Sequence, residues 1–171
     1  GWVGEIPQHW DLVRTRYLVD ISTGSGDITL NGTIGSNYDL DVVRSNGSGN
    51  FNINANINTK TINTGSGGTT VIDADSVVTS GTQTYNNAVL IKRNTSISAS
   101  NADITFGSTI NTHSSATTPT VSIDSGSATT TFNGAVGRDK VLGATSISAG
   151  LVVTGSGGTI AMGANALSIT T

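Results

Sequence analysis

The sequence predicts an all-β fold, a right-handed parallel β-helix (β-solenoid) with a short N-terminal helical cap. Three observations predict it: loose internal repetition, runs in which polar and apolar residues alternate, and Gly-rich corners between those runs. Repetition at a period of roughly 20 to 50 residues is typical of stacked repeat architectures, whose units bury a continuous core only when they stack. We expect two parts, an N-terminal segment over 1–21 and solenoid repeats over 22–171.

The N-terminal segment 1–21 differs from the rest of the chain. Both tryptophans fall within its first ten positions. Trp10, Val13 and Tyr17 follow the i, i+3, i+7 spacing of one helix face. The pattern predicts a short amphipathic helix over 9–19 that covers the first turn of the solenoid.

A unit made of a large apolar residue, Asn or Gly, a small residue and a β-branched residue recurs along the chain. Its copies are 28–34, 51–57, 82–89, 104–110 and 130–136. The large apolar residues stand at positions 30, 53, 85, 106 and 132, in steps of 23, 32, 21 and 26 residues. We interpret these positions as equivalent in successive turns.

Alternation predicts which face each run buries, because successive side chains of a strand point to opposite sides. In 95–99, Ile97 shares a face with Thr95 and Ala99, and the same run returns at 145–149. An antiparallel sandwich, the alternative fold, would usually carry more aromatic and apolar mass in each strand.

Four Gly-rich tetrads precede strand-like runs and mark the predicted corners. They are 23–26, 46–49, 64–67 and 154–157. Glycine suits tight corners because it adopts positive φ angles without steric cost. The 90 positions from Gly65 to Gly155 accommodate about four further turns of the same length.

Composition favours an ordered, extracellular protein. Charged residues make up only 11% of the chain and the net charge is −3, so there is no general attraction to phosphate backbones or anionic membranes. The absence of Cys excludes disulfides and thiolate metal sites, and suits a bacterial extracellular protein. No apolar run approaches the ~20 residues of a membrane-spanning helix, so we expect no membrane insertion.

The repeat units at 82–89, 103–110 and 130–137 resemble the repeats of filamentous haemagglutinin-like bacterial surface proteins and exoproteins, and the resemblance extends over roughly 22–171. It implies a right-handed parallel β-helix on the bacterial cell surface or secreted from it. The expected function is a non-enzymatic structural or adhesive segment. Its expected partners are glycans or proteins of host or neighbouring cells, or further copies of itself.

Residues 1–27 resemble the start of a target-recognition domain in specificity subunits of type I restriction-modification systems. This resemblance implies an alternative function, a DNA-binding specificity module. DNA binding requires a basic face, whereas residues 1–44 carry three Arg against six Asp and Glu. We therefore favour a cap over a specificity module, with DNA as a partner only under the alternative.

Asp73 and Asp75 are the first candidates for chemistry. At positions i and i+2 of a strand they would share a face, and paired carboxylates on a β-helix suit polysaccharide cleavage. The alternative is a solvated outer face, with Ile72, Ala74 and Val78 as the buried set. No His, Arg or Lys stands close in the sequence to complete a site, so we expect no catalytic residue.

Calcium binding through Asp73, Asp75 or Asp124 is the second candidate. A hard cation takes about six to eight oxygen ligands, and the Gly-Asp nonapeptide of calcium-binding β-rolls is not reproduced. His9 and His113 are two isolated imidazoles, fewer ligands than a metal site needs, and His113 is predicted to be a loop residue. We expect neither a metal nor a cofactor.

The remaining motifs predict no assembled chemistry. The chain has no Gly-x-Ser-x-Gly elbow, and Gly24-Ser25-Gly26 lacks the Lys of a phosphate-binding loop. Thr-x-Thr pairs, two hydroxyls on one face, would suit ice or glycan binding, but their uneven spacing favours ordinary strand residues. These pairs are Thr59 with Thr61, Thr82 with Thr84, and Thr129 with Thr131.

The two ends are predicted to differ. The helix over 9–19 would close the N-terminal end, whereas 166–171 continues a strand pattern without an equivalent cover. Together with a first residue, Gly1, that is not Met, this predicts a piece of a longer rod.

Overall fold

The computed structural model describes residues 19–20, 26–35, 37–42 and 48–171. Every element in this part of the chain is a β-strand, and every strand pairing is parallel. The strands return in cyclic order to three sheets, which we call sheets A, B and C. The predicted parallel β-solenoid is confirmed.

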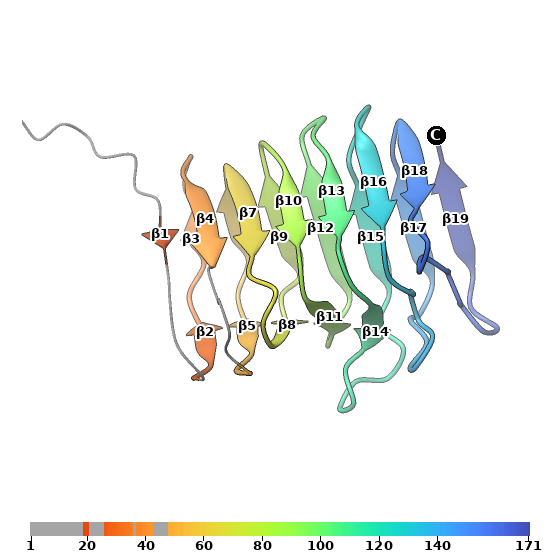
Figure 1. Cartoon of the computed structure of the whole chain (residues 1–171), viewed down its shortest axis with the longest axis horizontal. Coiled ribbons are helices and arrows are strands. Elements are labelled where there is room, and N and C mark those ends of the chain that lie inside the picture. Colours follow the sequence, from red (N-terminus) through yellow and green to blue (C-terminus); the bar gives the residue numbers. More distant parts are fainter. Residues whose placement is uncertain (1–18, 21–25, 36, 43–47) are drawn as a thin grey trace, which may run out of the picture.

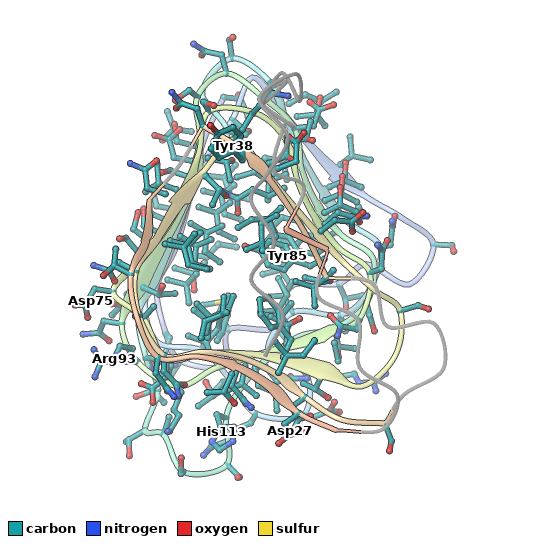
Figure 2. The ribbon with its side chains drawn as sticks, turned by 90° about the vertical axis from the view of Figure 1, so that its left-hand side faces the viewer. Asp27, Tyr38, Asp75, Tyr85, Arg93 and His113 are labelled. Atoms are coloured by element: carbon teal, nitrogen blue, oxygen red, sulfur yellow. The ribbon has the colours of Figure 1, made fainter. Side chains whose placement is uncertain are left out.

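The three sheets run side by side along the molecule and enclose a triangular interior (Figures 1 and 2). Sheet A contains β1 (Val19–Asp20), β4 (Asp39–Val42), β7 (Thr61–Thr64), β10 (Gln83–Tyr85), β13 (Ile104–Phe106), β16 (Thr129–Phe132) and β18 (Leu151–Thr154). Sheet B contains β2 (Ile28–Leu30), β5 (Phe51–Ile53), β8 (Thr69–Ile72), β11 (Ala88–Ile91) and β14 (Ile110–Thr112). Sheet C contains β3 (Ile34–Gly35), β6 (Ile57–Thr59), β9 (Ser76–Thr79), β12 (Thr95–Ala99), β15 (Val121–Asp124), β17 (Thr145–Ser148) and β19 (Leu167–Thr170).

Sheet B is reduced to single bridges beyond β14. Ile110 pairs with Val136, and Val136 pairs with Ile160. The path of the backbone therefore continues through all three sides even where too few residues pair to form a strand.

The interior is built from columns of equivalent residues in successive turns. In sheet C, Ile97, Ile123 and Ile147 are in register and all three are buried. Both runs whose alternation predicted a buried face, 95–99 and 145–149, therefore lie on the same side of the solenoid, and their inward residues are the predicted ones.

The large apolar residues that were predicted to be equivalent fall into two groups, one in sheet B and one in sheet A. The prediction is correct within each group and wrong between the two groups. Leu30 pairs in register with Ile53 in sheet B, whereas Tyr85, Phe106 and Phe132 form a column in sheet A. The step of 32 residues thus joins different sheets. The prediction failed there because the end of a sheet A strand and the end of a sheet B strand carry the same residue pattern, a large inward residue followed by a corner.

The two Gly-rich tetrads that are fully described, 64–67 and 154–157, occupy the same corner, from sheet A to sheet B. The sheet A register from Thr64 to Thr154 passes through Tyr85, Phe106 and Phe132, which makes four steps as predicted. Most of the tetrads 23–26 and 46–49 lies outside the described residues.

The two ends of the described solenoid are bounded by β1 in sheet A and β19 in sheet C. At one end, β1 pairs with β4, so sheet A already includes Val19 and Asp20 from the segment assigned to the cap. The rest of the predicted helix over 9–19 lies outside the described residues. At the other end, β19 pairs only with β17, and its Leu167 and Ile169 are 39% and 46% exposed.

The described residues contain no helix that is long and apolar enough to cross a membrane.

Candidate functional site

Asp73 and Asp75 lie in the corner between β8 and β9, where the chain passes from sheet B to sheet C, and not in a strand as predicted. Ala74 between them is buried, as predicted. Of the other two residues expected to be buried, Ile72 is, but in β9 the buried residue is Val77 rather than Val78. The corner changes the parity of the alternation, so an assignment made on one strand does not carry over to the next.

Both carboxylates meet basic residues from the next turn, which corrects the expectation that none is near. Lys92 Nζ lies 2.7 Å from Asp73 Oδ2, and Arg93 Nε lies 3.0 Å from Asp73 Oδ1. A second guanidinium nitrogen of Arg93 lies 3.2 Å from Asp75 Oδ1. Asp75 and Arg93 are seen at the same corner in Figure 2.

This charge cluster (Asp73, Asp75, Lys92 and Arg93) is an ion-pair network on the surface. Asp73 is the least exposed member, with 22% of its side chain accessible. Both of its carboxylate oxygens are already paired, Oδ2 with Lys92 and Oδ1 with Arg93. Asp75 is paired through Oδ1 with Arg93, and its side chain is 75% exposed. Opposed charges that satisfy one another suit the stabilisation of a corner better than proton transfer to a substrate.

The structure does not bring the other predicted ligands together. Asp124 lies at the end of β15 and its Oδ1 accepts the backbone N–H of Gly126 at 2.9 Å. His113 directly follows β14 and is a loop residue, as predicted. Within the described ranges, no group of three or more His, Cys, Asp or Glu side chains is placed to hold a metal ion. His9 lies outside them.

The Thr-x-Thr pairs do not form one surface. Thr59 is buried in β6 of sheet C, whereas Thr61 lies on the outer side of β7 in sheet A, so this pair does not share a face. Thr129 and Thr131 do share the outer side of β16. Thr84 is aligned with Thr131 through Thr105 of β13, which makes a short outward threonine column.

A longer hydroxyl column runs along sheet C, and sequence reasoning missed it. It consists of Ser76, Ser96, Ser122, Ser146 and Ser168, which are in register in five successive strands. In β9, β12, β15 and β17 the apolar residue after each serine points into the core, so these serines face outward. Ser168 of β19 continues the column because it is in register with Ser146. The signal in the sequence is a Ser that precedes an inward apolar residue by one position in each of these strands.

A groove of about 430 Å³ lies beside this column and the corner from sheet B to sheet C. Its lining combines corner residues with residues from the start of the sheet C strands: Asp75, Asn94, Thr95, Thr120, Val121, Ser122, Ala144, Thr145, Ser146, Ala166 and Ser168. The volume is in the range of small-ligand sites, roughly 300 to 1,000 Å³. The groove and the serine column together are the candidate site.

The groove offers hydrogen bonds with little charge. Asp75 is the only charged residue in its lining. Ser146 Oγ donates to Ser122 Oγ at 3.2 Å. The Ser122 hydroxyl can still donate a hydrogen bond to a ligand, and both oxygens can still accept one. Such a surface can bind hydroxyl-rich or amide-rich partners.

No family model matches the chain, and neither a curated protein nor a solved structure does. The likenesses to haemagglutinin-like repeats and to restriction specificity subunits therefore rest on the residues that carry them.

Proposed function

We propose that the chain is a non-enzymatic structural or adhesive segment of a bacterial cell-surface or secreted protein, wound as a right-handed β-helix. Right-handed winding is the expectation for parallel strands joined by crossovers in one sheet. The observation that supports the function best is the serine column with its groove. It places the same uncharged hydrogen-bonding group on the outer side of sheet C in five successive strands.

The repetition suits weak binding at many points. Neighbouring strands lie about 4.8 Å apart, so the hydroxyls form a regular row along the solenoid. A partner with repeated polar groups, such as a glycan chain, can meet several of them at once. Linked contacts of this kind raise overall affinity well above that of each contact alone.

The pairing of charges argues against a polyanionic partner on the described surface. Lys60 lies 3.4 Å from Asp39, Lys92 and Arg93 contact the two carboxylates of the charge cluster, and Arg138 lies 3.2 Å from Asp139. The alternative of a DNA-specificity module rests on residues 1–27, most of which lie outside the described part. No described contact favours it.

The experiment that tests the proposal is binding of the purified chain, displayed in many copies on beads, to arrays of neutral glycans and to bacterial and epithelial cell surfaces. We expect binding that a Ser122→Glu, Ser146→Glu double variant weakens at least tenfold. The matched control is Thr105→Glu, Thr131→Glu on the outer side of sheet A, which should bind as the unaltered chain does.

Three outcomes contradict the proposal. The beads bind no surface, or the sheet A control loses binding as fully as the sheet C variant, or the chain hydrolyses a glycan. A salt-sensitive shift of duplex DNA, strongest at low salt, would instead favour the specificity module.

A further inference from the structure

The loop 113–120 is the longest connection between sheets B and C among the turns in which both flanking strands are described. The corresponding corners in the two preceding turns are only 73–75 and 92–94. The loop projects from the body of the solenoid between β14 and β15 (Figure 1), with His113 at its base (Figure 2). A projecting loop of this length needs contacts of its own to be ordered.

Lys140, from the following turn, holds the first half of this loop. Its Nζ donates to three backbone carbonyls, those of His113 at 3.0 Å, Ser114 at 2.9 Å and Ala116 at 2.7 Å. The backbone of Lys140 is fixed in turn, because its carbonyl accepts the N–H of Thr112 at 3.0 Å. The ammonium group thus uses its three protons on three carbonyls of one loop.

The imidazole of His113 contacts Ser115 through Nδ1. The backbone N–H of Ser115 points at His113 Nδ1 at 3.2 Å, and Ser115 Oγ lies 2.8 Å from the same nitrogen. A backbone N–H can only donate, so Nδ1 must be an acceptor without a proton. This contact requires the neutral tautomer that carries its ring proton on Nε2.

Protonation would put a proton on Nδ1, directly opposite the N–H of Ser115. The Ser115 hydroxyl can rotate and become the acceptor, but the backbone N–H cannot, so that hydrogen bond is lost. The loss occurs at the residue between two carbonyls that Lys140 holds.

The charged groups around His113 come from both neighbouring turns. On the preceding side, His113 N–H donates to the carbonyl of Ile91, next to Lys92, which is paired with Asp73. On the following side lie Lys140 and its neighbours Arg138 and Asp139, which are paired with each other. Lys, Arg and Asp side chains keep their charge between about pH 5 and 8, the range in which histidines change theirs.

We propose that neutral His113 and Lys140 form an acid-sensitive latch that holds the projecting loop and loosens it when the imidazole is protonated. Contacts that a partner makes through this loop would then depend on pH. The inference does not depend on the adhesive function, since it concerns only the order of the loop.

The test is amide hydrogen exchange of the full chain between pH 8 and pH 5, corrected for intrinsic exchange, with NMR titration of the imidazoles. The chain has only two histidines, so a His9→Gln background isolates the signal of His113. We expect exchange at Ser115 to rise at least fivefold in acid, the loss of about 1 kcal/mol of hydrogen bond. The midpoint should coincide with the His113 titration, while the amides of β12 and β15 stay protected.

Two variants separate the parts of the latch. His113→Gln should abolish the pH step at Ser115. Lys140→Met should raise exchange at Ser115 and Ala116, whose N–H groups donate within the loop, at both pH values. The control Lys60→Met, on a distant corner, should leave them unchanged. The proposal is overturned if Ser115 is equally protected at pH 5 and pH 8 in the unaltered loop, or if the step persists in His113→Gln.

Discussion

The hydroxyl of Tyr85 donates a 2.8 Å hydrogen bond to Gln83 Oε1 inside the solenoid, two residues back on the same strand. Both side chains are fully buried. Gln83 Nε2 in turn donates to the carbonyl of Ser98 at 2.7 Å and to Thr79 Oγ1 at 3.1 Å, both on sheet C. The pair therefore ties sheet A to sheet C across the interior.

Removing the hydroxyl should destabilise the solenoid. Tyr85→Phe leaves Gln83 Oε1 buried without a donor, and an unpaired buried acceptor costs about 1–3 kcal/mol. Urea unfolding followed by circular dichroism gives the change in free energy of unfolding. The loss of unfolding free energy in the double variant Tyr85→Phe, Gln83→Leu should differ from the sum of the two single losses, because the double variant removes both partners of the bond. Additive effects would show that the two side chains are not coupled.

Tyr85 should also make the solenoid sensitive to alkali. Burial raises the pKa of its phenol above the ordinary value of about 10. The phenol then ionises in the unfolded chain but not in the folded one, so its contribution to stability is complete below about pH 10 and is lost as the pH rises beyond it.

The slope of this loss is about 1.4 kcal/mol per pH unit for one proton. Urea midpoints at pH 9, 10 and 11 should therefore fall more steeply for the unaltered chain than for Tyr85→Phe. Lysines titrate in the same range and contribute equally to both proteins. Parallel curves would contradict the expected role of Tyr85.

Phe106 should be the most sensitive aromatic residue of the interior. Its ring stacks on Tyr85 at 5.1 Å between centroids and on Phe132 at 5.4 Å, with interplanar angles of 6° and 2°. Phe106→Ala should cost about 3–5 kcal/mol, because the cavity lies between two rings that cannot close it. Phe106→Leu, which restores most of the volume, should cost less than about 1.5 kcal/mol. If Phe106→Ala and Phe106→Leu lower the free energy of unfolding equally, the stability of the stacked column does not depend on the side-chain volume at position 106.

The side of the sheet that a residue faces could be predicted from its neighbours within the same strand. Ile97 and Ile147 were assigned to the core correctly because alternation with a period of two is read over a few residues. The assignment of Val78 failed because the corner at 73–75 intervenes, and a corner can add one residue to the count.

Contacts between turns could not be predicted without the length of each turn. Lys92 meets Asp73, 19 positions earlier, whereas Lys140 meets the His113 carbonyl 27 positions earlier. The lengths vary because loops such as 113–120 are inserted at one corner and leave the strands in register. The charge cluster and the serine column both depend on this register, which is why the sequence alone showed them only as scattered residues.

The charge cluster should contribute a small, salt-dependent stability. Asp73→Ala removes the partner of Lys92 and one partner of Arg93, and should lower the free energy of unfolding by about 1 kcal/mol at low salt. Asp75→Ala, at a more exposed carboxylate with one pairing, should cost less than about half of that. At about 1 M NaCl, where screening acts within roughly 3 Å, the difference between the variants should shrink. If Asp73→Ala lowers the free energy of unfolding equally at low and high salt, Asp73 stabilises the corner through packing and not through charge.

Gly134 should be intolerant of any side chain because it is the point where two turns come closest at the corner after β16. A Cβ at this position would lie 2.6 Å from the carbonyl oxygen of Ser108 and 2.7 Å from the backbone nitrogen of Thr109. These are backbone atoms of the preceding turn, and the bond from Asn133 N–H to the Phe106 carbonyl, 2.9 Å, keeps the two turns from separating. Gly134→Ala should therefore cost about 1–3 kcal/mol, the usual price of overpacking.

The matched control is Gly32→Ala, at a corner where a Cβ meets nothing within 4 Å. Neither glycine has a positive φ, so backbone strain does not distinguish the two positions. Gly32→Ala should change the free energy of unfolding by no more than about 0.5 kcal/mol. Urea unfolding of both variants measures the difference directly. If the two substitutions are equally mild, the turns are not in close contact at the corner after β16, and the register of sheet A alone must set their spacing.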